Sequence, residues 1–146
     1  MPNKNSNILV TGSNGQLGSE IKELSKNYSY NFFFTDRNNI DITSKDNIKA
    51  FCQTNNINVI INCAAYTAVD KAESDVENAD LVNRKAVKKL ALVSEELNIK
   101  LIHISTDYVF DGKNFKPYCE EFQTNPQGVY GKTKLDGENE MRDINP

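Results

Sequence analysis

The chain has 146 residues, of which 38% are hydrophobic and 25% are charged, as in an ordinary globular domain. Its formal net charge of -3 gives no electrostatic attraction to nucleic acid or to an anionic membrane. No apolar segment is long enough to span a bilayer, and the first residues lack the hydrophobic core of a signal peptide, so we expect a cytoplasmic protein. The three cysteines and the single histidine share no metal-ligand spacing, which predicts free thiols and no metal site.

The first predicted element is a strand at residues 8–10, which ends in the glycine-rich turn TGSNGQLG at residues 11–18. A strand followed by such a turn and a helix is the usual context of a dinucleotide-binding site. We expect Gly12 to make the tight turn, Gly15 to let backbone N–H groups approach a pyrophosphate, and Gly18 to let the helix pack closely. The spacing Gly-x-x-Gly-x-x-Gly is also compatible with a turn that is only structural.

Strands and helices alternate along the rest of the chain. Apolar runs and helical spacing predict strands at 32–36, 59–65 and 101–105 and helices at 19–24, 44–54 and 76–97. Ser44 is the expected N-cap of its helix, and the strand at 59–65 reads as buried on both faces. This alternation predicts an α/β fold with a doubly wound parallel sheet of the Rossmann type.

A long loop is expected over residues 111–127, and such loops in compact domains are usually functional. Tyr130 and Lys134 follow it, and on a helix they share one face because four residues make about one turn. An ammonium beside a phenol favours the phenolate, so the pair suits acid/base chemistry on an alcohol or ketone. Tyr-x-x-x-Lys alone also arises by chance on surface helices. It becomes informative here because the same chain contains the glycine-rich turn.

Taken together, the glycine-rich turn, Asn83, Thr106 and the Tyr130–Lys134 pair resemble the extended short-chain dehydrogenase/reductase superfamily. Two longer motifs, NCAAYTAVDKAE at 62–73 and STDYVFDG at 105–112, are more specific and resemble the dTDP-4-dehydrorhamnose reductase family. The resemblance covers nearly the whole chain, which we interpret as one partial NAD(P)-binding Rossmann domain over 1–146. Family members are about twice as long. We therefore expect the sheet to be truncated before its last strands and the substrate lobe to be absent.

The resemblance implies that NADH or NADPH reduces the C4 ketone of dTDP-4-dehydro-6-deoxy-L-mannose to dTDP-L-rhamnose, a step of polysaccharide biosynthesis. Tyr130 would donate the proton and Thr106 would hydrogen-bond the carbonyl oxygen, so both would stabilise charge that develops in the transition state. Lys134 would assist Tyr130 and bond the nicotinamide ribose. Asn83 matches an asparagine that supports this lysine in the superfamily, although it could also be a polar residue on a solvated helix face.

The same resemblance assigns residues to the two binding sites. The expected substrate residues are Thr67, Val69, Thr106, Asp107 and Tyr108. The expected cofactor residues are Gly12, Asn14, Gly15, Gln16, Leu17, Gly18, Asp36, Arg37, Asp41, Ile42, Ala64, Ala65, Tyr66, Asn83, Tyr130 and Lys134. An acid such as Asp36 binds the ribose 2′-hydroxyl of NAD, whereas Arg37 could pair with the 2′-phosphate of NADP, so both cofactors remain open.

Tyr108 and His103 argue against two other readings of the motifs. Tyr108 stands where nucleotide-sugar 4,6-dehydratases carry a glutamate, which disfavours elimination of water. His103 lies inside an apolar run and is expected to be a hydrogen-bonded core histidine and not a catalytic one.

A second functional class remains open. The same motifs occur in a non-catalytic relative, the regulatory subunit of methionine adenosyltransferase, where the fold binds a cofactor or a partner. The joint presence of Thr106, Tyr130 and Lys134 favours an enzyme whose partner is a dTDP-sugar.

The truncation predicts an exposed sheet edge. With a strand order of 3-2-1-4, the strand at 101–105 would lie at an unprotected edge, and such edges recruit other chains. We therefore expect either a homodimer or poor order after about Pro117.

Overall fold

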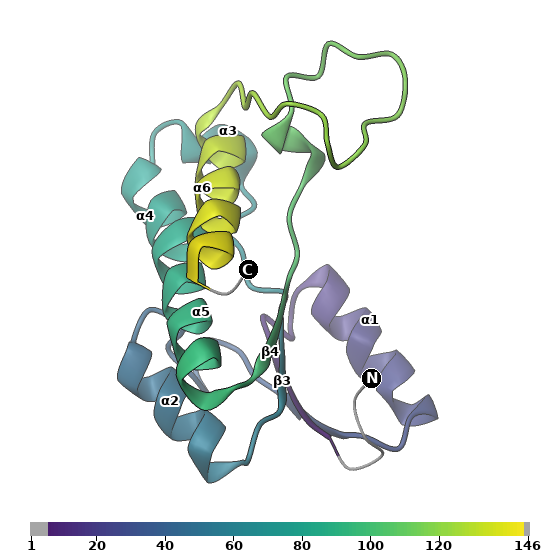
Figure 1. The fold of residues 1–146 in the computed structure, drawn as a ribbon, viewed down its shortest axis with the longest axis vertical. Helices are drawn as coiled ribbons and strands as arrows, with labels where there is room; N and C mark the ends of the chain where they lie inside the picture. The colour runs from purple at the N-terminus through teal and green to yellow at the C-terminus, as the bar shows by residue number, and fades with distance from the viewer. Residues whose placement is uncertain (1–5, 145–146) are drawn as a thin grey trace.

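A computed structural model describes residues 6–144 of the chain (Figure 1). Within this range, one parallel sheet has the spatial order β2-β1-β3-β4. Its strands are β1 (Asn7–Thr11), β2 (Asn31–Phe34), β3 (Val59–Asn62) and β4 (Lys100–His103). All of the pairings are parallel, which confirms the predicted α/β fold.

Helices cover both faces of the sheet. The α-helices are α1 (Gln16–Leu24), α2 (Lys45–Thr54), α3 (Val69–Ala72), α4 (Val76–Asp80), α5 (Ala86–Leu97) and α6 (Val129–Ile144). Shorter segments are the 3₁₀ turns η1 (Ser25–Asn27) and η3 (Asp107–Val109) and the π-helical turn η2 (Leu81–Lys85). Figure 1 shows α1 on one side of the sheet and α2, α4, α5 and α6 on the other. No helix in the described part of the chain is both long and apolar enough to cross a membrane.

The observed strand order corrects the predicted order 3-2-1-4. The third strand pairs with β1 and not with the outer edge of β2. Between β2 and α2 the chain forms turns at 37–39 and 42–43, which the carboxylates of Asp36 and Asp41 stabilise. Asp36 accepts from the N–H of Asn38, and Asp41 accepts from that of Thr43. After α2 the chain crosses over β1 and forms β3 on its other side, so the strand order reverses between β1 and β3.

Alternate side chains of the central strands build two cores. Leu9 and Ile60 face α2 and α5, where they pack with Ile48 and Leu90. Val10 belongs to the opposite cluster with Ile8 and Val59, against which Ile21 of α1 packs. Burial of both faces is typical of parallel strands and explains the continuous apolar runs in the sequence.

The predicted helix boundaries are largely confirmed. Ser44 caps α2, where its side chain accepts from the N–H of Asn47 at 3.3 Å. The helix expected over 76–97 is continuous but contains the π-helical turn η2, which carries the buried Asn83. Such turns widen a helix locally and occur often at functional sites.

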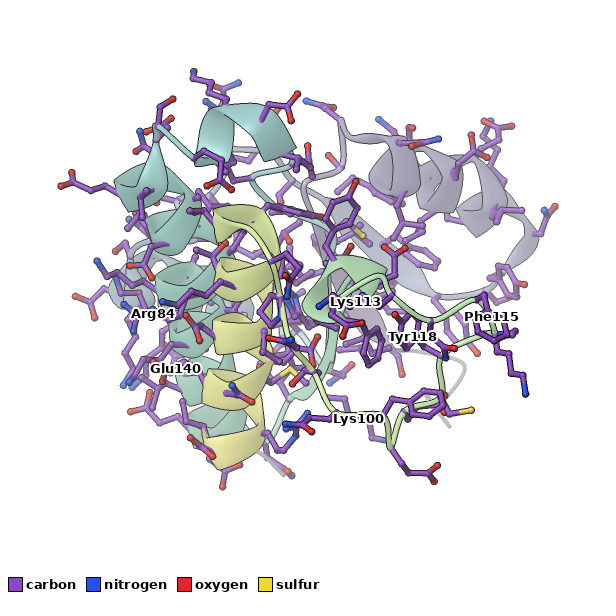
Figure 2. All side chains as sticks on the ribbon, turned by 90° about the horizontal axis from the view of Figure 1, so that it is seen from above. Arg84, Lys100, Lys113, Phe115, Tyr118 and Glu140 are labelled. Atoms are coloured by element: carbon purple, nitrogen blue, oxygen red, sulfur yellow. The ribbon has the colours of Figure 1, made fainter. Side chains whose placement is uncertain are left out.

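The segment between η3 and α6 contains no helix or strand, as expected for 111–127. Its aromatic side chains form a small cluster, in which Phe110 and Tyr118 stack with ring centroids 4.4 Å apart and Phe122 contacts Tyr118 edge-on. Phe115 is 94% exposed. Figure 2 shows it at the outer end of the loop, far in that view from Arg84 and Glu140.

Helix α6 packs tightly against η2 and η3. A Cβ atom at Gly131 would lie 2.2 Å from the carbonyl oxygen of Tyr108, and one at Gly137 would lie 2.2 Å from that of Asn83. Arg84 of η2 adds ion pairs with Asp80 and, at 3.3 Å, with Glu140 of α6. These contacts fix α6 against the rest of the domain, and poor order after about Pro117 stays a prediction.

We expect Gly137→Ala to destabilise the protein by about 1–3 kcal/mol, because the methyl group would overlap the backbone of Asn83. Alanine at an ordinary helix position would instead stabilise relative to glycine. Urea unfolding measures the change, with Asn139→Ala on the exposed face of α6 as control. A Gly137→Ala protein as stable as the parent would contradict this close packing.

Candidate functional site

A cavity of about 1160 Å³ lies at the carboxyl ends of the strands, where the strand order reverses between β1 and β3. This switch point is where open α/β sheets bind ligands. The cavity is lined by Thr11, Gly12, Asn14, Gly15, Gln16, Leu17, Thr35, Asp36, Arg37, Asn38, Ile40, Asp41, Ile42, Thr43, Cys63, Ala64, Ala65, Tyr66, Thr67, Lys71, Asn78, Val82, Ile104, Ser105, Tyr130 and Lys134. The structure thus gathers most of the predicted cofactor residues.

The glycine-rich turn forms one wall of this cavity. Gly12 has a φ of 63°, and a Cβ there would lie 2.7 Å from the backbone of Ala64, so the fold itself requires glycine. A Cβ at Gly18 would lie 2.5 Å from the Gly12 carbonyl oxygen. A Cβ at Gly15 meets only that oxygen, at 3.3 Å, so a side chain there would be far less crowded than at Gly12 or Gly18 but would require a small backbone shift. No described side chain caps α1, so its N-terminal N–H groups remain for an anion.

The residues after β2 line the cavity next to the glycine-rich turn. Asp36 accepts from the side chain of Asn14 at 2.6 Å, which ties these residues to the glycine-rich turn. Arg37 lines the cavity as well, so the acid predicted to bind NAD and the arginine predicted to bind NADP both lie at the cavity. Hydrogen bonds from the hydroxyl and backbone N–H of Thr43 lower the pKa of Asp41, which therefore stays ionised near neutral pH.

Asn83 joins the loop after β3 to α6. Its Oδ1 accepts from the N–H of Tyr66 at 2.8 Å, and its Nδ2 donates to the carbonyl oxygen of Tyr66 and to the hydroxyl of Thr133. The side chain is 1% exposed, so the alternative of a solvated helix face is wrong. It reaches Lys134 only through the adjacent Thr133. Asn83 therefore connects the backbone of Tyr66 to helix α6.

Tyr130 and Lys134 both line the cavity from α6, as their spacing predicted. Lys134 is 2% exposed, and its Nζ donates to the carbonyl oxygen of Ile104 and lies 3.3 Å from Nε2 of His103. Burial lowers the pKa of Lys134 to about 8, against an opposing contribution from Glu138. The cavity therefore contains an ammonium that is held rigidly and gives up its proton more readily than an ordinary lysine.

The lowered pKa predicts a specific pH dependence of stability. The unfolded chain binds the Lys134 proton more tightly than the folded protein does, so the destabilisation is fully present below pH 8 and disappears as pH approaches 10.5. Over that window the free energy of unfolding should gain up to about 3 kcal/mol from this residue. Lys134→Met should remove the gain in urea unfolding at pH 7 and pH 10, whereas Lys132→Met should keep it. Equal pH slopes for the parent and Lys134→Met would refute the assignment.

Thr106 does not line the cavity. Its hydroxyl accepts from the N–H of Tyr108 at 3.2 Å and donates to Asp107, so it caps η3. The ring of Tyr108 lies edge-on to that of Tyr130, with 5.5 Å between centroids. Of the expected substrate residues, only Thr67 lines the cavity, and Val69 lies on α3.

The sequence analysis missed several residues that line the cavity. Lys71, Asn78, Val82 and Ser105 belong to this group. The two long motifs contain Lys71 and Ser105, so their membership in those motifs was an available signal. Asn78 and Val82 lie on α4 and η2, and only the packing of that helix under the loop after β3 brings them to the site.

The cysteines and acidic residues show no arrangement for a metal. Among the described residues, no group of three or more His, Cys, Asp or Glu side chains could hold an ion. Cys52, Cys63 and Cys119 are free, and burial raises the pKa of Cys52 to about 11 and also raises that of Cys63. Cys63 therefore lies at the cavity as a neutral thiol.

The parallel sheet, the glycine-rich turn and the cavity at the switch point define a Rossmann-type α/β domain. The family model described as RmlD substrate binding domain matches residues 6–146. The chain therefore belongs to the RmlD substrate binding domain family. The matched range includes the glycine-rich turn and the Tyr130–Lys134 pair.

Individual relatives agree with this assignment. A dTDP-4-dehydrorhamnose reductase of Sinorhizobium fredii is 40% identical over 95% of this chain and 47% of its own length. A solved dTDP-4-dehydrorhamnose reductase of Clostridium acetobutylicum is 44% identical with a TM-score of 0.92, over 96% of this chain and 50% of that chain. A solved dTDP-4-dehydrorhamnose reductase of Bacillus anthracis, in complex with NADP, is 33% identical with a TM-score of 0.93. The match covers 97% of this chain and 50% of that chain. This chain spans about half the length of the curated relatives that it matches.

Proposed function

We propose that this chain is the cofactor-binding part of an NAD(P)H-dependent reductase that converts dTDP-4-dehydro-6-deoxy-L-mannose to dTDP-L-rhamnose. The observation that carries the proposal is the position of Tyr130 and Lys134 on the same cavity as the glycine-rich turn. The relatives named dTDP-4-dehydrorhamnose reductase support the choice of reaction. The cytoplasm remains the location expected from the sequence.

The residues present fit a nicotinamide dinucleotide. Gly15 leaves room for a pyrophosphate against the N-terminus of α1, and Asp36 with Arg37 would contact the adenosine ribose. Tyr66 and its neighbours after β3 would bound the nicotinamide, with their backbone fixed by Asn83. When bound, the reduced cofactor supplies a hydride. Since Asp36 suits NAD and Arg37 suits NADP, the chain is expected to accept either one.

The protein's own part in the reaction is general acid catalysis, the donation of a proton to the ketone oxygen. Tyr130 would donate it to the ketone oxygen as negative charge develops there, and the buried ammonium of Lys134 would stabilise the phenolate that remains. The hydroxyl of Thr106 would hydrogen-bond the same oxygen once it is released from its contact with Asp107. The dTDP-sugar would enter beside Thr67 and Tyr108, with the remainder of its site supplied by a second half such as that of the relatives.

A turnover assay tests this function. A polypeptide that contains these residues and a second half like that of the relatives should oxidise NADPH or NADH in the presence of the dTDP-4-keto sugar and release dTDP-L-rhamnose, identified by chromatography and NMR. A protein that binds the dinucleotide tightly yet turns over no keto sugar would favour the non-catalytic alternative, a regulatory subunit like that of methionine adenosyltransferase. Retention of Tyr130 and Lys134 at the cavity argues for the enzyme.

We expect this chain to self-associate through β4, an edge strand of the sheet. Ile102 of this strand is 48% exposed, so an apolar side chain accompanies the unpaired backbone. Ile102→Lys should convert a dimer to a monomer in analytical ultracentrifugation, whereas Leu24→Lys, at a similarly exposed position on α1, should not. A strictly monomeric parent would contradict the prediction.

A further inference from the structure

A chain of polar side chains crosses the sheet below the cavity. The hydroxyl of Thr11 on β1 lies 2.6 Å from Oδ1 of Asn62 on β3, whose Nδ2 lies 3.0 Å from Nδ1 of His103 on β4. Nε2 of His103 lies 3.3 Å from Nζ of Lys134 on α6. Thr11, Asn62 and Lys134 are each no more than 2% exposed, so water does not replace these contacts.

The donors and acceptors of this chain are tightly coupled. A lysine ammonium has three donors and no acceptor, and the carbonyl oxygen of Ile104 takes one of them. Nε2 of His103 can accept a second donor only when it carries no proton. Burial and the adjacent Lys134 lower the pKa of His103 to about 3, so the ring is neutral and carries one proton. Next to the ammonium, that proton must be on Nδ1.

The side-chain amide of Asn62 can hydrogen-bond Nδ1 of His103 in either tautomer of the ring, as an acceptor or as a donor. With Oδ1 toward His103, it accepts from Nδ1–H, and its Nδ2 donates to Thr11. With Nδ2 toward His103, as the structure has it, Nδ1 accepts and the proton moves to Nε2. Nε2–H can then bond only to the neutral amine of Lys134. Each protonation state of Lys134 therefore matches one tautomer of His103 and one orientation of the Asn62 amide.

We propose that His103 is a positioning residue for Lys134, and that its neutral ring changes tautomer, together with a turn of the Asn62 amide, when Lys134 loses its proton. The other ionisable groups near Lys134 are Glu138 and Tyr130, both on α6 itself. Besides His103 itself, the described strands bring the uncharged side chains of Asn62 and Thr11 to this chain. The catalytic part of this inference rests on the proposed function. There, Nε2 of His103 would accept a second hydrogen bond from the Lys134 ammonium, whose first goes to the carbonyl oxygen of Ile104.

Nitrogen NMR of the 146-residue chain tests the proposal directly, because the sequence has one histidine and a labelled imidazole gives one unambiguous pair of signals. At pH 6 to 7 we expect the proton on Nδ1, and we expect it to move to Nε2 as the pH rises through about 8. Lys134→Met should abolish the pH-dependent change, and Lys132→Met should leave it intact. Amide spectra of each variant establish that it is folded.

The outcomes separate this inference from the proposed function. An Nε2–H tautomer at pH 6, a tautomer that does not change up to pH 10, or a ring that gains a proton near pH 6.5 would overturn the positioning role. Since the measurement needs neither cofactor nor turnover, such a result would leave the reductase assignment standing. If the tautomer change is seen but a protein that contains this chain and a second half reduces no keto sugar, the proposed reductase function is overturned and the positioning role of His103 stands.

The catalytic consequence has its own measurement. In a reductase that contains this chain, His103→Phe should lower kcat about tenfold with KM for the sugar nearly unchanged and should shift the basic limb of the pH profile. His103→Gln, which keeps a neutral acceptor, should recover most of kcat. A purely structural role would instead lower stability in both variants and leave the pH profile in place.

Discussion

Tyr130→Phe should lower the turnover of a reductase that contains this chain by about 10²- to 10⁴-fold, with cofactor affinity nearly unchanged. The substitution keeps the ring and its edge-on contact with Tyr108 but removes the hydroxyl that would donate the proton. The expected loss lies in kcat because the hydroxyl stabilises charge that exists only in the transition state. Steady-state kinetics and a separate binding titration distinguish the two quantities.

Tyr28→Phe is the matched control for this change. Tyr28 is 59% exposed and follows the helical segment at the far end of α1, so loss of its hydroxyl should alter neither kcat nor binding. Normal turnover of Tyr130→Phe would remove the acid/base role and, with it, the argument that joins the Tyr130–Lys134 pair to the reaction.

Gly15→Val should weaken the binding of NADPH and NADH by at least about 100-fold, close to abolition. The side chain would project where the pyrophosphate must approach the backbone of the glycine-rich turn. A Cβ at this position meets one atom, the Gly12 carbonyl oxygen at 3.3 Å, so a shift of a few tenths of an ångström would admit the side chain without unfolding the protein. Fluorescence titration measures the affinity, and urea unfolding checks that stability is preserved.

Glu20→Val, on the exposed surface of α1, is the control for adding a valine to this region. It should bind as the parent does. Binding of unchanged strength to Gly15→Val would mean that the pyrophosphate lies elsewhere, although the glycine-rich turn would remain a structural feature of the fold.

The sequence predicted the α/β class because each strand is a short apolar run and each helix has an apolar face at helical spacing. It also predicted the tight turn at Gly12 and the close packing at Gly18, since a strand, a turn and a helix in sequence leave few other geometries. Ser44 was identified as an N-cap from local chemistry alone. These features are local, and local pattern is what a single sequence records best.

The features that sequence reasoning missed are non-local. The strand order depended on which side of β1 the third strand would take, and that choice is a matter of long-range pairing that no local pattern records. The capping of η3, which begins at the next residue, by the Thr106 hydroxyl was not anticipated either; the place of Thr106 at the reacting oxygen stays a prediction. The contact between His103 and Lys134 joins residues 31 positions apart, which no spacing rule anticipates.

The account's central claim is that this chain binds a nicotinamide dinucleotide at the cavity between β1 and β3. A fluorescence titration of the 146-residue chain with NADPH, and in parallel with NADH, tests it most directly. We predict weak but saturable binding at one site that Gly15→Val abolishes and Tyr130→Phe retains. An absence of saturable binding of either dinucleotide to the folded chain, or binding that Gly15→Val leaves unchanged, would contradict the claim.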